Sequence, residues 1–461
     1  MLPVSVTSLT LPFEFNNNNI PIDLRNLKNL RELFFGTHFN QNINGLLPPS
    51  LEMLAFADNY NNDNVQLDLT NLKNLKHLIF TKTNRTFNQD INDKLPNSLE
   101  RIVFNNTFSN GGTKLYLKKL NTLKILSVGD GYNNDINNVL PQSLEVLLLG
   151  SGFANGGIQL NITNLNKLRE LRFNDTGTVF NQNINNILPT SLQIMSVGEN
   201  FTNNNQQLTL TNLINLKELS ILSVLFNQNI NNVLPVSLEV LALDRDFANN
   251  NEQLDITNLT NLKILEIMST AFNQNINGKL PTSLQKLTFG LSFNNGNQQL
   301  DIRNLNNLIT LIFKLSVFDQ NINDSLPVSL KDLLIKGSSF KNGDNDLNLL
   351  SLTNLQLLVF SPDCPFNKNI NNSLPKSLLI LALDNIFNNN NVQVDLKNLT
   401  KLTRLIFYHD SIFNQNVNGR LPLSLRFFMH GINFNNDNAE WRVNEEIPNL
   451  IVGVSPPGNA L

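Results

Sequence analysis

The sequence has very little cysteine and histidine, and each shortage narrows the chemistry that the chain can perform. Cys364 is the only cysteine, so no intramolecular disulfide can form and a disulfide-stapled secreted scaffold is excluded. The four histidines show no zinc-binding spacing with the cysteine. We therefore expect neither a metal ion nor another cofactor.

Charged residues are also scarce. They make up 15% of the chain, with 34 basic and 37 acidic residues and a net charge of -3, whereas an average domain has about 25%. No run of Lys and Arg stands out, so nucleic acid is not expected as a partner. Asparagine fills the polar positions that Lys and Glu usually occupy.

Long apolar runs are missing as well. No stretch approaches the ~20 apolar residues of a membrane-spanning helix. The first residues, MLPVSVTSLTLPFEF, contain neither a basic segment nor the apolar core of a signal peptide. The sequence therefore predicts a cytoplasmic protein that does not bind membranes.

What the sequence does contain is one segment in many copies. The stretch Phe39–Phe56 reads FNQNINGLLPPSLEMLAF, and the prolines of its Leu-Pro-x-Ser-Leu core recur from Pro48 to Pro422 at intervals of 45–48 residues. A second type of segment, such as YNNDNVQLDLTNLKNLKHLIF at Tyr60–Phe80, lies between them, which makes the unit about 23 residues long. Leucines at fixed offsets in a unit of this length predict a leucine-rich-repeat-like solenoid.

Each unit has one segment with the periodicity of a β-strand. Leu51, Leu54 and Phe56 illustrate its pattern, Leu-x-x-Leu-x-Leu/Phe, whose last three residues alternate inward and outward. From residues 9–11 to 452–454 the pattern predicts about twenty parallel strands in ten alternating pairs of Pro-type and Asn-type repeats, with a mostly irregular or short helical convex side. We expect the solenoid at residues 1–438, and a C-terminal cap with a last degenerate strand at residues 439–461.

An aromatic residue follows each predicted strand. These nineteen positions hold seventeen Phe residues, Tyr60 and Tyr132, and we expect their rings to stack as an internal spine. Three residues after each ring, from Asn18 to Asp437, stands Asn, Asp or Gly, the residue types that best tolerate a positive φ. The pattern predicts a tight turn with one left-handed residue in every repeat, and Asn side chains that bond the turns of neighbouring coils.

The combined FNQNIN and Leu-Pro-x-Ser-Leu motifs resemble the FNIP repeat family of slime moulds and giant viruses of amoebae, over essentially the whole chain. Where that family often has Pro after Asn-Gln, this chain has Asn42, Asp90, Asn183 or Asn229, which fits the same turn. Family members often carry an F-box ahead of the repeats, which implies substrate recognition for ubiquitin ligases. Because the repeats here begin at residue 1, we do not expect the ligase-docking role. For a viral chain the resemblance implies the host cytoplasm.

Catalytic residues are hard to assemble from this sequence. A Cys–His nucleophile pair needs a separation of ~3 Å, yet Cys364 and His409 fall in loops two coils apart, roughly 10 Å by strand spacing. Gly129-x-Gly131 and Gly150-x-Gly152 lack the third glycine of a phosphate loop and lie at ordinary turns after strands. We therefore predict that the protein is not an enzyme.

The outward side chains of the strands are the remaining candidates for a binding site. They are apolar near both ends of the chain and more polar in the middle, and exposed apolar patches usually mark interaction surfaces. Insertions at one site of the Asn-type repeats, as at 81–86 and 408–412, place extra loops along one edge of the solenoid. The predicted partner-binding residues are Ile312, Leu334, Val359, Ile380, Ile406, Tyr408, His409, Phe427 and Met429.

These patterns favour a non-catalytic scaffold that binds a protein partner through its concave face and edge loops. One alternative is a substrate-recognition subunit of a ubiquitin ligase without its own F-box. Another is a parallel β-helix that binds or cleaves polysaccharide, since Asn ladders also occur there. An Asn-rich, aggregation-prone chain is disfavoured by the strict register of Leu and Phe. The strand edge at Leu9–Leu11 offers a surface for self-association.

Overall fold

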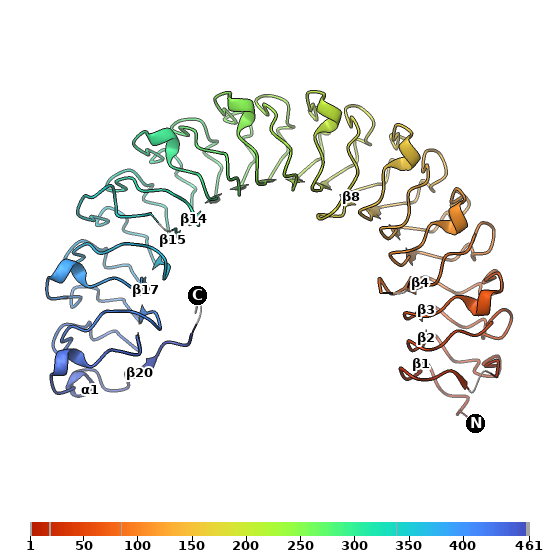
Figure 1. Cartoon of the computed structure of the whole chain (residues 1–461), viewed down its shortest axis with the longest axis horizontal. Helices are drawn as coiled ribbons and strands as arrows, with labels where there is room; N and C mark the ends of the chain where they lie inside the picture. The colour runs from red at the N-terminus through yellow and green to blue at the C-terminus, as the bar shows by residue number, and fades with distance from the viewer. Residues whose placement is uncertain (1, 18–19, 84, 338, 458–461) are drawn as a thin grey trace. The chain divides into compact units, whose positions relative to one another are not determined.

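The computed structural model describes residues 2–17, 20–83, 85–337 and 339–457. The chain divides into two compact units, Met1–Phe226 and Asn227–Leu461. The described residues of each unit contain ten short strands, and successive strands lie one after another along the chain (Figure 1). The strands of the first unit are β1 (Ser8–Thr10), β2 (Glu32–Phe34), β3 (Met53–Phe56), β4 (His77–Phe80), β5 (Arg101–Val103), β6 (Ile125–Ser127), β7 (Val146–Leu149), β8 (Glu170–Phe173), β9 (Ile194–Val197) and β10 (Glu218–Ile221). Those of the second unit are β11 (Val240–Leu243), β12 (Ile264–Ile267), β13 (Lys286–Phe289), β14 (Thr310–Lys314), β15 (Asp332–Lys336), β16 (Leu357–Phe360), β17 (Ile380–Leu383), β18 (Arg404–Phe407), β19 (Phe427–His430) and β20 (Ile451–Val454).

Within each unit every strand pairs in parallel with the next strand along the chain. Each coil therefore contributes one strand, which confirms the predicted leucine-rich-repeat-like solenoid of about twenty parallel strands. The parallel β-helix alternative is wrong as an architecture, because a coil of that fold contains more than one strand and the described coils do not.

The leucines of the repeat face inward and form the core of each unit. Leu54 and Leu78 pair in register and are buried, whereas Ala55 and Ile79 on the same strands face outward and are half-buried. Because burying one leucine side chain stabilises a fold by about 1.5–3 kcal/mol, this ladder is the main source of stability. We call the outward side of the strands the strand face.

The predicted aromatic spine is confirmed. The ring centroids of Phe87 and Phe108 in the first unit lie 6.1 Å apart with nearly parallel planes, and those of Phe293 and Phe318 in the second unit are also 6.1 Å apart. Neighbouring strands in a sheet are only about 4.7–4.9 Å apart, so the coils are more widely spaced at the spine than at the strands. Each unit therefore curves with its strand face on the concave side.

Half of the turns after the spine contain more left-handed residues than predicted. Among the described residues, nine triplets of Asn, Asp and Gly have three successive positive φ values and form one left-handed turn each, as in Asn249–Asn251 with φ of 53°, 53° and 58°. The other eight triplets are Asn62–Asn64, Asn110–Gly112, Asn155–Gly157, Asn203–Asn205, Asn295–Asn297, 342–344, Asn389–Asn391 and Asn436–Asn438. The predicted left-handed residue is the middle one of each triplet.

In the turns that precede the Leu-Pro motifs, the predicted position of the left-handed residue is wrong. Asn229, three residues after a spine ring, does not have a positive φ. Its Oδ1 instead accepts a hydrogen bond of 2.8 Å from the backbone N–H of Asn231, and the left-handed residue is Asn232, with a φ of 60°. A side-chain hydrogen bond thus closes this turn where a left-handed backbone closes the other type. Asn18 lies outside the described residues.

Asparagine side chains connect neighbouring coils, as predicted. Asn249 is buried, and its Oδ1 accepts the backbone N–H of Ile230 at 2.8 Å. Asn227 Oδ1 accepts two N–H groups of the next coil, that of Ala248 at 2.9 Å and that of Asn250 at 2.8 Å. Buried backbone N–H groups need hydrogen-bond acceptors. In these turns the Asn side chains supply the acceptors that backbone carbonyls supply in a helix.

The side of each unit opposite the strands is irregular. The backbone N–H groups of Leu72 and Leu75 donate to carbonyls three residues earlier, which makes successive turns rather than a helix. In the described part of the chain the α-helix is α1 (Val443–Glu446), which precedes β20 in the region predicted as a cap. The boundary at residue 438 stays a prediction. No helix among the residues described is long and apolar enough to span a bilayer.

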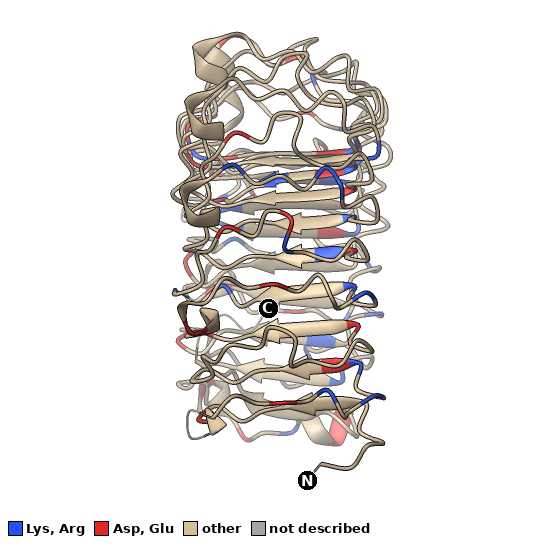
Figure 2. Cartoon of the chain, turned by 90° about the vertical axis from the view of Figure 1, so that its right-hand side faces the viewer, with Lys and Arg blue, Asp and Glu red and all other residues tan. Residues whose placement is uncertain are grey.

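A row of alternating charge precedes the strands of the first unit. Glu52 pairs with both Arg31 and Lys76, the latter at 2.8 Å, and Glu100 pairs with Lys124 at 3.0 Å. These residues lie at the starting ends of the strands, where acidic and basic residues gather in Figure 2. Pro-type coils carry the acid and Asn-type coils carry the base. If the pairing of strands skipped one coil, two coils of the same type would become neighbours and like charges would lie side by side. The row therefore favours the native register.

Candidate functional site

The predicted partner-binding residues lie on the strand face of the second unit, mostly in one row. The parallel register places Ile312 beside Leu334 and Leu334 beside Val359. Ala382 occupies the position between Val359 and Ile406. Strands β14 to β18 thus bring together outward side chains that are far apart in the sequence.

The centre of this row is packed rather than open. Val359, Ile406 and Tyr408 are only 1%, 8% and 3% exposed and form a buried cluster with Ala382. Four half-buried apolar side chains pack around this cluster: Leu334, Leu357, Ile380 and Met429. Six of the nine predicted residues therefore meet in one place. A partner at this place would contact mainly the four surrounding side chains.

The other three predicted residues lie outside this cluster. Ile312 is half-buried, and so is Phe427, whose ring centroid lies 5.1 Å from the guanidinium carbon of Arg404 in a cation–π contact. His409 donates through Nδ1 to the carbonyl oxygen of Ser455 at 2.8 Å, so its imidazole is engaged within the chain. The binding role of all nine residues stays a prediction.

A buried acid lies next to this cluster. Asp384 is fully buried; its Oδ1 accepts the backbone N–H of Ile386 at 2.8 Å, while its Oδ2 has no hydrogen-bond partner among the described residues. Burial raises the pKa of Asp384 to about 8. Burial also raises the pKa of Tyr408 to about 12, and the nearby Asp384 and Cys364 add to that increase. The carboxyl group is therefore neutral at pH 7, which allows it to stay inside the fold.

The buried thiol is not suited to nucleophilic chemistry. Cys364 is buried and its Sγ lies 3.7 Å from the carbonyl oxygen of Phe340. Burial raises the pKa of the Cys364 thiol well above its usual value, and the thiolate, not the thiol, is the reactive form. Over the described ranges no three His, Cys, Asp or Glu side chains gather to hold a metal ion.

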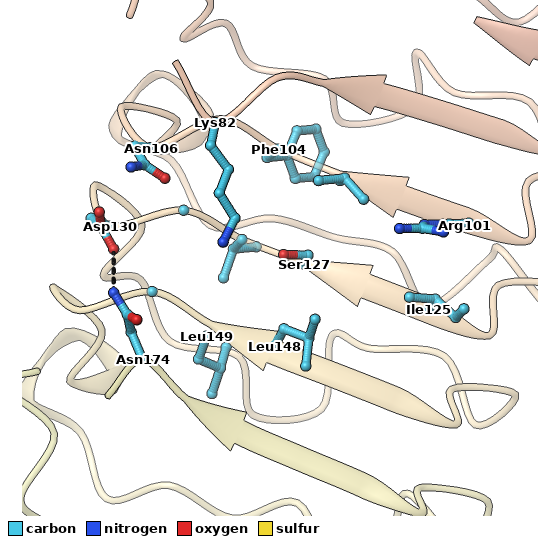
Figure 3. Close-up of a pocket in the computed structure, with 14 residues that line it drawn as sticks. Lys82, Arg101, Phe104, Asn106, Ile125, Ser127, Asp130, Leu148, Leu149 and Asn174 are labelled. Atoms are coloured by element: carbon cyan, nitrogen blue, oxygen red, sulfur yellow. Dashed lines mark hydrogen bonds between the residues drawn. The ribbon is translucent and has the colours of Figure 1, made fainter. Parts of the chain in front are cut away.

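The first unit contains a second candidate, a pocket of about 240 Å³ on the strand face (Figure 3). Its floor is formed by outward side chains of three neighbouring strands, with Val103 on β5, Ile125 and Ser127 on β6, and Leu148 on β7. The polar side chains that border this floor are Lys82, Asn106, Asp130 and Asn174 on one side and Arg101 toward the other (Figure 3).

Glycines allow the coils to approach closely beside this pocket. A Cβ on Gly129 would lie 2.0 Å from the carbonyl oxygen of Asn105, and a Cβ on Gly150 would lie 2.3 Å from the carbonyl carbon of Gly129. No larger residue fits at either position without a shift of the backbone. The structure thus confirms that these Gly-x-Gly motifs are parts of turns.

The acidic side chain at the pocket has hydrogen-bond partners within the described chain, whereas the basic side chains have no ion-pair partner there. Asp130 Oδ1 accepts the backbone N–H of Ser151 at 2.8 Å, and the Asn174 carboxamide lies 3.4 Å from the same oxygen. Lys82 and Arg101 form no ion pair within the described part of the chain, where Glu100 is bound by Lys124. The pocket therefore presents two cations outside any described ion pair, together with one carboxylate, that of Asp130.

Sequence reasoning missed this pocket because its lining comes from consecutive coils, each side chain roughly one repeat from the next. The insertion at 81–86, which carries Lys82, pointed toward it, and so did the Gly-x-Gly motifs at Gly129 and Gly150, which line the pocket. An insertion marks an edge of the solenoid, but it does not reveal which outward side chains lie opposite.

One strand per coil, an inward leucine ladder and an irregular opposite side define the class of the protein, a leucine-rich-repeat solenoid. Neither a protein-family model nor a curated protein sequence matches the chain at a significant level. CroV588, a circular leucine-rich-repeat protein of a giant virus, has 30% sequence identity and a TM-score of 0.70, over 98% of this chain and 69% of CroV588. The chain belongs to the leucine-rich-repeat proteins.

Two bacterial leucine-rich-repeat structures also match at lower similarity. A leucine-rich-repeat protein of Leptospira interrogans is 17% identical over 96% of this chain and all of that protein, with a TM-score of 0.40. An internalin of Listeria monocytogenes is 15% identical over 87% of this chain and 86% of the internalin, with a TM-score of 0.34.

Proposed function

We propose that the protein is a non-catalytic scaffold that binds a protein partner through its strand face and edge loops. Leucine-rich-repeat folds typically mediate protein–protein interactions. The observation that carries the proposal is the group of half-buried apolar side chains around the cluster in the second unit, namely Leu334, Leu357, Ile380 and Met429. Apolar side chains that lose their remaining contact with water contribute to binding in proportion to the apolar area that becomes buried.

The packing beneath this surface also supports binding. Val359, Ala382 and Ile406 are already buried, so the surface is held in one arrangement before a partner arrives. A pre-organised surface loses less side-chain entropy on binding than a mobile one. The exposed Ile412 of the 408–412 edge loop extends the apolar area toward the edge.

The experiment is capture of proteins from an amoebal cell extract on the immobilised protein, with wild type compared to the double variant Ile380→Asp and Phe427→Asp. Both residues are half-buried, so the fold should survive, and circular dichroism checks that it does. We expect the variant to lose the proteins that the wild type retains. Leu350→Asp with Leu423→Asp is the matched control, because both leucines are exposed and lie outside the strand face. Equal capture by wild type and the double variant would place the binding surface elsewhere.

We further propose that the chain is an FNIP repeat protein that acts in the cytoplasm, of the host if the protein is viral. The repeated FNQNIN and Leu-Pro-x-Ser-Leu motifs support this assignment. The same resemblance supports a second candidate, a substrate-recognition subunit of a ubiquitin ligase without its own F-box. Ubiquitin-ligase subunits among the captured proteins would favour that candidate. We propose neither nucleic acid nor membrane as a partner.

Self-association through the first coil remains a separate proposal. β1 pairs with β2, and Leu9 on β1 is half-buried. An unpaired strand edge can add a strand from another copy. Leu9→Pro should then lower the mass measured by sedimentation without changing capture by the second unit.

A further inference from the structure

We propose that the pocket on β5, β6 and β7 binds an extended segment of a partner protein in which an acidic residue neighbours an apolar one. The inference deepens the proposed scaffold function and rests on it. It concerns a surface of the first unit, whereas the apolar cluster described above belongs to the second.

The charges of the pocket select the acidic residue. Lys82 and Arg101 both line the pocket and form no ion pair within the described chain, whereas Glu100, in the row of alternating charge beside them, pairs with Lys124. A carboxylate brought between these two cations gains their attraction without breaking an existing ion pair. An arginine also offers a carboxylate two parallel N–H donors.

The floor of the pocket selects the apolar neighbour. Val103, Ile125 and Leu148 are half-buried and face outward, so a partner's aliphatic side chain would complete their burial. Burial of apolar area contributes affinity in proportion to that area. A purely anionic ligand such as a free phosphate would leave this floor uncovered.

The one acid of the pocket sets the orientation of the segment. Asp130 is fixed by the backbone N–H of Ser151 at 2.8 Å and lies at the same border as Asn106 and Asn174 (Figure 3). A ligand carboxylate is repelled from this border. The acidic side chain therefore points away from Asp130, across the floor toward Arg101, with Lys82 on the nearer side (Figure 3). The ligand backbone then passes the carboxamide of Asn106 at the border.

The experiment selects random peptides displayed on phage against the whole protein. Wild type should enrich peptides with Asp or Glu next to Leu, Ile or Val. Lys82→Gln with Arg101→Gln should lose the acidic preference and keep the apolar one, and Leu148→Ser should do the reverse. The control Lys28→Gln with Lys118→Gln removes the same charge outside the pocket and should leave both preferences intact.

A selected peptide is then synthesised with its acid intact and with Gln or Asn in its place, and binding is measured by fluorescence anisotropy. The amide peptide should bind wild type about five- to tenfold more weakly, as expected for one or two solvent-accessible ion pairs, and the Lys82→Gln, Arg101→Gln variant should not distinguish the two peptides. Selection without an acidic preference, or a preference that survives the double variant, overturns the proposal. Equal displacement of the peptide by a random DNA oligonucleotide also overturns it, because attraction of charge alone would then explain binding.

The outcome is separable from that of the scaffold proposal. Capture from an amoebal extract tests the apolar surface of the second unit, and the variants in the two experiments share no residue. Peptide selection that fails while capture succeeds refutes the pocket alone. Failure of capture with successful peptide selection refutes the second-unit surface alone.

Discussion

At the scale of single residues, the abundance of asparagine has a structural cause. The left-handed triplets need residues that tolerate a positive φ, and among residues with a side chain Asn and Asp tolerate it best. The first residue of the triplet, such as Asn249, is also buried and accepts a backbone N–H from the preceding coil. Glycine meets the first requirement but not the second, which explains why the triplets begin with Asn and have Gly only at later positions.

The middle residue of a triplet provides a direct test. Asn250 has a φ of 53° and an exposed side chain. Asn250→Val should lower the free energy of unfolding by about 1–2 kcal/mol because a β-branched residue is strained there. Asn250→Gly should be nearly neutral, because glycine adopts this conformation freely. Urea unfolding followed by circular dichroism measures both.

Asn229 is the matched control. Its φ is not positive, and its side chain accepts the N–H of Asn231. Asn229→Val and Asn229→Gly both remove this hydrogen bond, so valine should be no worse than glycine. A clear preference for glycine at Asn229 would contradict the assignment of the two turn types.

The buried carboxyl group makes stability depend on pH. Asp384 keeps its proton in the folded state up to about pH 8, whereas an aspartate in the unfolded chain loses it near pH 3.9. Between these values the folded protein binds more protons than the unfolded chain, so the free energy of unfolding decreases as the pH rises. Asp384→Asn keeps an acceptor for the N–H of Ile386 and removes the titration. The urea midpoint of the variant minus that of wild type should increase as the pH rises from about 5 to 8. A difference that stays constant over this range would contradict the role of Asp384.

At the scale of strands and turns, the repeat pattern predicts most of the structure. The Leu-x-x-Leu-x-Leu/Phe spacing locates the strands because a single period decides both the strand and its buried face. The two turn types could not be separated in this way, since an Asn that adopts a positive φ and an Asn that accepts an N–H look alike in sequence. Val359 and Ile406 were predicted as outward residues, and the register confirms their row. Their burial depends on neighbouring coils, which alternation within one strand does not report.

The alternating charge row is an element-scale feature with its own test. Glu52 pairs with Arg31 in one direction and Lys76 in the other, and both bases lower the pKa of Glu52. Glu52→Lys would place three bases in succession and should lower the urea midpoint at low salt. About 0.5 M sodium chloride should reduce the difference, because exposed charges are screened. Glu14→Lys makes the same charge change at an exposed residue outside the row, and an equal effect there would show that net charge, not the row, is responsible.

At the scale of the whole molecule, stability is expected to be local in each unit. Hydrogen bonds, spine contacts and strand pairs join a coil mainly to the coils directly before and after it, as Phe293 shows with Phe272 at 6.2 Å and Phe318 at 6.1 Å. In a protein built this way, stability is approximately a sum over coils and their interfaces. Damage to one coil should therefore spread first to its neighbours in the same unit.

Phe293→Ala tests this expectation. Phe293 is buried and also stacks on Phe289 at 3.7 Å, so removing its ring should lower the free energy of unfolding by about 3–5 kcal/mol. Hydrogen–deuterium exchange read by mass spectrometry should become faster in β13 and β14, less so toward β17 and β18, and should stay at the wild-type rate in β3 to β6 of the first unit, because local opening follows local contacts. Leu291→Ala, at an exposed residue of the same coil, should leave exchange unchanged throughout. Faster exchange in both units to the same degree would mean that the whole chain opens as one cooperative body, and stability would then not be local.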